Sequence, residues 1–234
     1  MSILNESQLD RDKELAKLLG MTLKEVQALP IATPDSIRIS DGEKPENLED
    51  LYHDYEHLNF PAYLRTLMKT SATRRHPELF KFLKSVKHRN CLDFGSGVGT
   101  HAIALLENYN WVGILDVPGK LFDFAKKRIE ERDYPNPFNN KVGIWNNTSD
   151  LPDDFFDVVI CTDVLEHVED PIKELCRIRR TMKIGGVLHL QVSTMVKPSS
   201  GHFKESIDKW KMTGKSYLDK YFEKVGATLY RRKK

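Results

Sequence analysis

The chain has 234 residues, of which 40% are hydrophobic and 30% are charged, a composition typical of a globular protein with a sizeable core. Its formal net charge is +2, from 36 basic and 34 acidic residues, which argues against a dedicated nucleic-acid binder because such proteins carry a clear basic excess. The three cysteines, Cys91, Cys161 and Cys176, have no metal-binding or redox spacing, and their small, odd number suits a reducing compartment.

The start of the chain is charged and lacks the apolar core of a signal peptide. No stretch of the sequence reaches the ~18–20 consecutive apolar residues that a membrane-spanning helix needs. These two features predict a cytoplasmic protein that contacts no membrane.

Residues 1–75 carry helical patterns and no strand pattern. Residues 7–20 and 22–30 have helical spacing, and Thr22 with Glu25 forms a capping box at the start of the second helix. Residues 47–70 continue the helical pattern on both sides of a proline. We expect residues 1–75 to form a helical cap or substrate lid, and residues 76–234 to form the main domain.

The main domain alternates short apolar runs with helical patterns. Each apolar run has the length of a strand and the continuous hydrophobicity of one buried on both faces. This alternation predicts an α/β fold with a doubly wound, mostly parallel sheet. The expected strands are residues 90–94, 111–115, 141–145, 155–161 and 186–192, and the expected helices between them are residues 100–109, 119–132 and 171–182.

The end of the chain leaves little room for further strands. After a helical pattern that reaches Gly226, only residues 227–234 remain, which is enough for one strand. The sequence therefore predicts a six-stranded sheet with one uncovered edge. Because an uncovered edge can pair with another strand, we expect a homodimer or a partner protein there.

A glycine-rich loop joins the first expected strand to the next helix. Gly95, Gly97 and Gly99 occupy alternate positions after Asp93, which suits a backbone that approaches a ligand closely. Dinucleotide-binding loops instead space their glycines G-x-G-x-x-G, with the third glycine one position later. Asp116 ends the next strand, where a carboxylate can accept hydrogen bonds from both hydroxyls of a ribose.

Four stretches in order resemble the class I S-adenosylmethionine-dependent methyltransferases, and most closely the branch that includes the type 11 and quinone methyltransferases. They read "LDFGSGVGTHAIAL", "WVGILDVPGKLFDFAKKR", "DLPDDFFDVVICTDVLEHVEDP" and "MKIGGVLHLQVST". The resemblance implies a Rossmann-like methyltransferase fold and the cofactor S-adenosylmethionine, with S-adenosylhomocysteine as its product. The implied cofactor-binding residues are Asp93, Gly95, Ser96, Gly97, Gly99, Asp116, Val117, Asn147, Thr148 and Thr162.

The stretch "DVLEHV" after the fourth strand offers the candidates for catalysis, Glu166 and His167, and His202 follows downstream. If the turn is helical, Asp163 and His167 share one face. Three interpretations stay open: hydrogen bonds that only stabilise the loop, a general base, or a divalent ion. Relatives with E-x-x-E-H bind such an ion, but here the first position is Asp163, so no residue is assigned to a metal.

The resemblance implies an enzyme that methylates an oxygen, nitrogen or carbon atom of a small-molecule acceptor, such as an aromatic compound or natural product. Tyr63 and Arg65 are among the expected acceptor contacts. One alternative is a methyltransferase of RNA or another nucleic acid, which the near-neutral charge disfavours. A second is a non-catalytic cofactor-binding subunit of a complex. A third is an NAD-dependent enzyme, which the glycine spacing disfavours.

Overall fold

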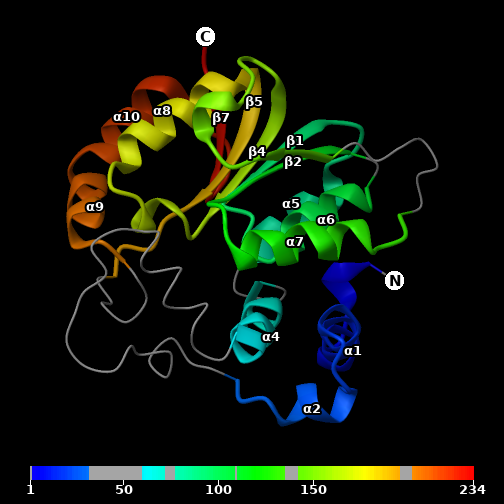
Figure 1. Ribbon diagram of the computed structural model, residues 1–234. Coiled ribbons are helices and arrows are strands. Elements are labelled where there is room, and N and C mark those ends of the chain that lie inside the picture. Colours follow the sequence, from blue (N-terminus) through cyan, green and yellow to red (C-terminus); the bar gives the residue numbers. More distant parts are fainter. Residues whose placement is uncertain (1, 32–59, 72–76, 109, 135–141, 196–201) are drawn as a thin grey trace.

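The computed structural model describes residues 2–31, 60–71, 77–108, 110–134, 142–195 and 202–234. Within these residues the chain forms a seven-stranded sheet in the order β3-β2-β1-β4-β5-β7-β6 (Figure 1). The first five strands are mutually parallel, and β7 runs antiparallel to both β5 and β6. The strands are β1 (Asn90–Phe94), β2 (Trp111–Leu115), β3 (Val142–Trp145), β4 (Phe156–Thr162), β5 (Met182–Gln191), β6 (Phe222–Lys224) and β7 (Leu229–Arg232).

Helices cover both faces of this sheet, and three N-terminal helices lie beyond α7 (Figure 1). α5, α6 and α7 cover one face, and α8 and α10 cover the other. The α-helices are α1 (Gln8–Leu19), α2 (Leu23–Ala28), α4 (Phe60–Ser71), α5 (Pro77–Ser85), α6 (Thr100–Leu106), α7 (Lys120–Glu130), α8 (Pro171–Thr181), α9 (Lys204–Lys209) and α10 (Lys215–Tyr221). Short turns η1 (Ile3–Asn5), η2 (Thr148–Asp150), η3 (Leu165–His167) and η5 (Trp210–Gly214) complete the described elements.

The strands alternate their side chains between two apolar cores, as the pleat of a sheet requires. Cys91 of β1 packs with α5, α6 and α7, whereas its neighbours Leu92 and Phe94 pack with α8 and α10. In β4, Val158 and Ile160 belong to the first core. Since both faces are covered, the continuous apolar runs of the sequence are explained, and the predicted doubly wound α/β fold is confirmed.

The predicted strand number was wrong, because the described residues contain seven strands and not six. α10 ends at Tyr221, so Phe222–Lys224 can form β6, a strand of three residues anchored by the buried Phe222. β6 pairs with β7, and β7 pairs with β5. The strand predicted after Gly226 is β7, and the edge beyond it that was predicted to be open is covered by β6. A partner at the sheet edge stays a prediction.

The N-terminal helices α1, α2 and α4 pack against one another and against the start of α7. Thr22 and Glu25 form the predicted capping box at the start of α2. The part of the helix predicted before Pro61 lies outside the described residues, and Pro61 is the second residue of α4. Among the helices that the structure describes, none has the length and hydropathy needed to cross a membrane.

Candidate functional site

The glycine loop leaves β1 at the carboxyl edge of the sheet in a left-handed backbone conformation. Gly95, Gly97 and Gly99 have φ values of +76°, +52° and +74°, a region that side chains other than glycine disfavour. The backbone N–H groups of Gly95 and Ser96 both donate to the carbonyl oxygen of Leu115, at 2.8 and 3.1 Å. The loop is therefore tied to the end of the neighbouring strand β2.

The three glycines differ in what surrounds them. A Cβ atom at Gly95 would lie 2.3 Å from Val164 Cγ2, and one at Gly99 would lie 3.4 Å from Ile129 Cδ1. A Cβ atom at Gly97 would meet nothing within 4 Å. Gly95 and Gly99 thus allow close packing within the protein, whereas Gly97 faces open space in which a ligand can lie.

This contrast gives a matched pair of variants. Gly97→Ala should lower the free energy of unfolding only by the left-handed strain, about 1–2 kcal/mol, yet weaken cofactor binding by filling the open space. Gly95→Ala adds a clash with Val164 and should destabilise the ligand-free protein more. Thermal unfolding and calorimetric titration of both variants measure the two effects, and equal stability losses would contradict this assignment of the two glycines.

Asp116 follows β2 and hydrogen-bonds to the glycine loop. Its Oδ2 accepts from the Gly97 N–H at 2.7 Å, and its Oδ1 accepts from the Val117 N–H at 2.9 Å. The side chain is only 8% exposed. Burial raises the pKa of Asp116 to about 6, although the two N–H donors oppose this shift. The remaining lone pairs of the carboxylate are available for hydroxyl donors of a ligand, as predicted for a ribose.

Asp93 lies beneath the loop rather than at its surface. Its Oδ2 accepts from the N–H of Ala102 in the first turn of α6 at 3.0 Å, and its Oδ1 lies 3.7 Å from His101 Nδ1. With 1% exposure, the carboxylate supports the start of α6. Its predicted contact with the cofactor stays a prediction.

The other predicted cofactor residues point in different directions. Asn147 is exposed, and its Oδ1 accepts from the N–H of Ser149 at 3.0 Å, which caps η2. The carbonyl oxygen of Thr148 accepts from NH2 of Arg180 on α8 at 3.0 Å. Thr162 Oγ1 lies 3.3 Å from Nδ1 of His189 on β5. The structure thus joins Gly97 directly to Asp116 and ties Gly95 and Ser96 to the neighbouring Leu115, whereas Asn147, Thr148 and Thr162 bond elsewhere.

Glu166 is the centre of the second part of the site. It is fully buried in η3, and its Oε1 accepts from the N–H of Ser193 at 2.9 Å. Its Oε2 is buried without a hydrogen-bond partner among the described residues. Burial raises the pKa of Glu166 to about 7, with a smaller contribution from the negative charge of Asp163.

Two histidines lie beside Glu166. The rings of His167 and His202 are 4.8 Å apart between centroids, at 80° to each other. Nδ1 of His202 lies 2.7 Å from the carbonyl oxygen of Met195. Because a carbonyl can only accept, this Nδ1 carries the hydrogen, and the Nε2 of a neutral His202 keeps its lone pair. Ligand atoms of Glu166, His167 and His202 all lie within 4.8 Å of one another.

One sequence expectation at this turn was wrong, and a candidate acceptor contact on α4 has another partner. Asp163 has a left-handed φ of +55° and precedes the three-residue η3, so it does not share a helical face with His167. It is also not part of the group of neighbouring ligand atoms. Arg65, an expected acceptor contact, instead pairs with Asp12 through Nε and NH2, both at 2.9 Å, and caps α2 by donating to the Leu29 carbonyl.

The two parts of the site meet at Val164. This residue follows β4, lies against Gly95, and precedes η3, which holds Glu166 and His167. Sequence reasoning did not find Ser193 and Met195, because they act through their backbone atoms and no residue type signals that role.

The loop has features that fit S-adenosylmethionine. Ser96 is 6% exposed, and its Oγ has no hydrogen-bond partner in the part of the chain that is described. Such a hydroxyl can bond to a polar group of a ligand. Together with the open space at Gly97 and the acceptor at Asp116, it provides the polar contacts that an amino-acid and ribose ligand requires.

Two curated proteins are similar to this chain in sequence. The chain is 30% identical to an uncharacterized protein of Methanocaldococcus jannaschii, over 61% of this chain and 59% of that protein. It is 27% identical to the tRNA U34 carboxymethyltransferase of Shewanella frigidimarina, over 70% of this chain and 50% of that enzyme. The chain therefore spans between 50% and 59% of the length of these curated relatives.

Two solved structures are similar to this chain with TM-scores below 0.5. An S-adenosylmethionine-dependent methyltransferase of Methanococcus maripaludis is similar with a TM-score of 0.47 and 16% identity, over 83% of this chain and 95% of that one. A methyltransferase of Bacillus halodurans is similar with a TM-score of 0.41 and 22% identity, over 48% of each chain.

The family profile described as "Methyltransferase domain" matches residues 55–229. This match includes the glycine loop, Asp116 and the turn that holds Glu166. It confirms the resemblance seen in the sequence. The chain belongs to the methyltransferase domain family, among the class I S-adenosylmethionine-dependent methyltransferases.

Proposed function

We propose that this protein transfers a methyl group from S-adenosylmethionine to an oxygen, nitrogen or carbon atom of a small-molecule acceptor in the cytoplasm. One observation carries the proposal: Val164 brings an open glycine loop next to the turn that holds a buried carboxylate and His167, with His202 beside them. The first part suits the cofactor, and the second suits an acceptor that must lose a proton.

When bound, S-adenosylmethionine supplies an electrophilic methyl group on a sulfonium, so the protein needs no covalent nucleophile. The glycine loop and Asp116 orient the ligand, and the turn with η3 positions the acceptor atom in line. His167 then takes the proton that the acceptor loses as its bond to carbon forms. Glu166 holds the loop that carries Ser193, and its carboxyl group lies beside the imidazole that takes the proton.

A divalent cation is a second candidate for the same cluster. The neighbouring ligand atoms of Glu166, His167 and His202, with one carboxylate oxygen that lacks a partner, fit an ion such as zinc or manganese. The hydrogen bond from His202 Nδ1 to a carbonyl is the arrangement that orients a metal-binding Nε2. Such an ion would bind acceptor oxygens and lower the pKa of a hydroxyl.

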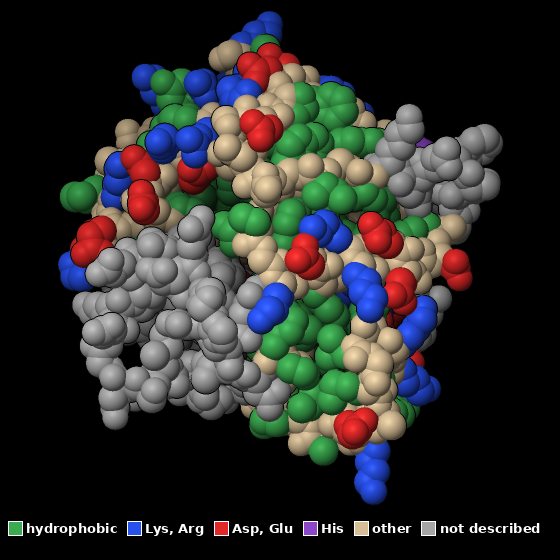
Figure 2. Space-filling model, in the orientation of Figure 1, with side chains coloured by type: hydrophobic (Ala, Val, Ile, Leu, Met, Phe, Trp, Pro, Cys, Tyr) green, Lys and Arg blue, Asp and Glu red, His purple; other side chains and the backbone are tan. Residues whose placement is uncertain are grey.

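A small molecule is favoured over RNA as the acceptor because of the charge distribution. On the face drawn in Figure 2, the basic and acidic side chains of the described residues are interspersed and form no single basic patch. Nucleic-acid binders gather basic side chains where the phosphates lie. One curated relative is named for a tRNA substrate, so tRNA is included in the test below.

The test begins with calorimetric titration of S-adenosylmethionine, S-adenosylhomocysteine and NAD into the purified protein. We expect micromolar binding of the first two and none of NAD. Methyl transfer from radiolabelled cofactor is then measured with phenols, catechols, amines and total tRNA, before and after dialysis against a chelator. Transfer to tRNA alone would contradict the small-molecule assignment, and an unchanged rate after chelation would count against the cation.

A further inference from the structure

Arg128 of α7 holds the glycine loop from beneath. Its side chain is fully buried, which is uncommon for arginine unless every donor has a partner. NH1 donates to the carbonyl oxygen of Val98 at 2.8 Å and to the hydroxyl of Thr100 at 3.0 Å. Val98 and Thr100 flank Gly99. The guanidinium therefore holds in place the segment through which the loop enters α6.

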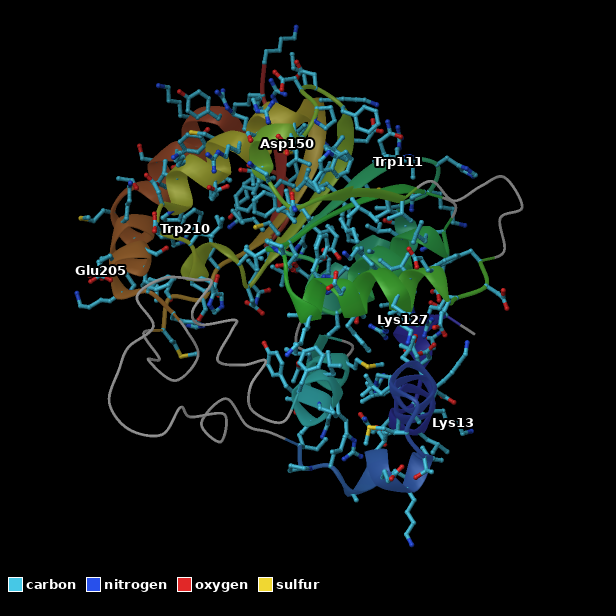
Figure 3. All side chains as sticks on the ribbon, viewed as in Figure 1. Lys13, Trp111, Lys127, Asp150, Glu205 and Trp210 are labelled. Carbon is cyan, nitrogen blue, oxygen red and sulfur yellow. The ribbon has the colours of Figure 1, made fainter. Side chains whose placement is uncertain are left out.

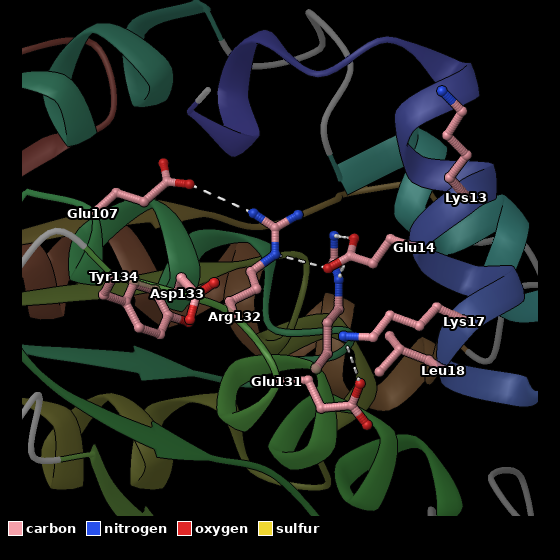
Figure 4. A pocket seen from close by; sticks show the side chains of 10 residues that line it. Lys13, Glu14, Lys17, Leu18, Glu107, Glu131, Arg132, Asp133 and Tyr134 are labelled. Carbon is pink, nitrogen blue, oxygen red and sulfur yellow. Dashed lines mark hydrogen bonds and ion pairs between the residues drawn. The ribbon is translucent and has the colours of Figure 1, made fainter.

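The same guanidinium binds Glu14 of the N-terminal helix α1. Nε and NH2 of Arg128 donate to Glu14 Oε2 at 3.1 and 2.9 Å, and Arg132 Nε donates to Oε1 at 2.7 Å. In Figure 4 a dashed line joins Glu14 to Arg132, and both residues line a pocket of about 410 Å³. Burial alone would raise the pKa of Glu14, but the two arginines more than offset it and lower that pKa.

Apolar contacts connect the same two parts of the chain. The side chain of Val98, at the centre of the loop, is 3% exposed and belongs to one apolar cluster with the N-terminal helices. Lys127 lies where α7 meets α1 (Figure 3), and its Nζ donates to the Leu18 carbonyl at 2.6 Å. The buried members of this cluster are Leu15, Ala16, Leu18, Val26, Leu64, Met68, Val98, Leu121 and Phe124.

We propose that Glu14 and Arg128 are positioning residues for the cofactor loop, so that the docking of α1 sets the affinity for S-adenosylmethionine. This inference rests on the proposed function, in which the glycine loop binds that cofactor. An ion pair with fixed hydrogen-bond geometry holds the Val98 and Thr100 positions in one arrangement, and an unpaired buried Arg128 would have to move toward water. Because such coupling is reciprocal, cofactor binding also strengthens the docking of α1.

The chain offers a closely matched control on the same helix. Asp12, two positions before Glu14, is buried and pairs with Arg65 of α4, but Arg65 does not contact the loop. Glu14→Gln and Asp12→Asn each neutralise one acid of α1 that is paired with an arginine. Only Glu14→Gln should act on the loop, whereas both should lower the thermal stability of the N-terminal helices.

We expect Glu14→Gln to raise the Kd for S-adenosylhomocysteine about tenfold, and Asp12→Asn to leave it within twofold. With an active acceptor from the screen above, the KM for S-adenosylmethionine should rise in the same way, while kcat at saturating cofactor stays within twofold. Hydrogen exchange at the Val98–Thr100 amides should accelerate in Glu14→Gln alone. Equal effects of the two variants on Kd would overturn the inference, because the loss would then be one of general stability.

The reciprocal measurement uses the wild-type chain and therefore does not depend on a variant that folds. Saturation with S-adenosylhomocysteine should slow hydrogen exchange in α1 as well as in the loop. Slowing in the loop alone would overturn the coupling and leave the proposed function intact. If the wild-type chain does not bind S-adenosylhomocysteine, the proposed function itself fails.

Discussion

Asp116→Ala is expected to weaken the binding of S-adenosylhomocysteine about 100-fold. The substitution removes the buried acceptor for the ribose hydroxyls, and hydrogen bonds to a charged group contribute more than neutral ones. It also frees the Gly97 N–H, which now donates to Asp116 at 2.7 Å, so the loop loses a constraint. Calorimetric titration at pH 7.5 measures the loss.

Asp123→Ala serves as the control, because this acid of α7 has a side chain that is 68% exposed and pairs only with the nearby Lys126 among the contacts described. Its affinity for S-adenosylhomocysteine should match that of the wild type. If Asp116→Ala also binds within threefold of the wild type, Asp116 does not bind the ribose, and the ligand must lie elsewhere.

The raised pKa of Asp116 adds a pH dependence to the same experiment. Burial raises the pKa of Asp116 to about 6, so the carboxyl group is mostly protonated below that pH. The protonated form carries no charge and accepts fewer hydrogen bonds. Ribose hydroxyls bind the charged form better, so affinity should rise between about pH 5 and pH 7 and then level off. Asp116→Ala should remove this rise.

His167→Gln is expected to lower the rate of methyl transfer about 100-fold without changing the affinity for S-adenosylhomocysteine by more than twofold. General bases contribute factors of ~10²–10⁴, and glutamine keeps the size of the side chain without a basic nitrogen. The rate is measured with the most active acceptor from the screen, and the affinity by calorimetry. A rate within threefold of the wild type would show that His167 only stabilises the loop.

His202→Gln distinguishes the two roles of the histidine cluster. If His167 is the base, the His202→Gln variant should keep its affinity for S-adenosylhomocysteine and a substantial rate of methyl transfer. If a cation binds Glu166, His167 and His202, both substitutions should abolish the rate together with the metal content measured by mass spectrometry. The ligand atoms of His167 and His202 lie close together, so the same substitution, histidine to glutamine, tests both positions.

Local patterns in the sequence predicted most of the fold. Strands buried on both faces read as continuous apolar runs, and the alternation with helical patterns gave the parallel part of the sheet. The positive φ values at Gly95, Gly97 and Gly99 explain why the loop was recognisable, since the backbone there excludes other residues. β6 was not predicted because it has only three residues and directly follows a helix, which is too short a stretch to show the alternating pattern of a strand.

Burial of charged side chains could not be predicted from the sequence. Arg128 reads as one basic residue in an amphipathic helix, and its partner Glu14 lies 114 positions away. Arg65 was interpreted as an acceptor contact for the same reason, because its partner Asp12 lies 53 positions away. The burial of Glu166 depends on the complete fold in the same way, because the backbone carbonyls of η3 accept from Phe203 and Ser206, about 40 positions further along the chain.

The insertion of β7 between β5 and β6 has a consequence for assembly of the sheet during folding. β6 reaches the sheet through β7, although it precedes β7 in the chain. β6 therefore joins the sheet only through β7, either after Leu229–Arg232 has paired with β5 or together with it as a hairpin. Until then β5 presents the open N–H and C=O groups of an edge strand, so any partly folded state without β7 is the form most prone to aggregate.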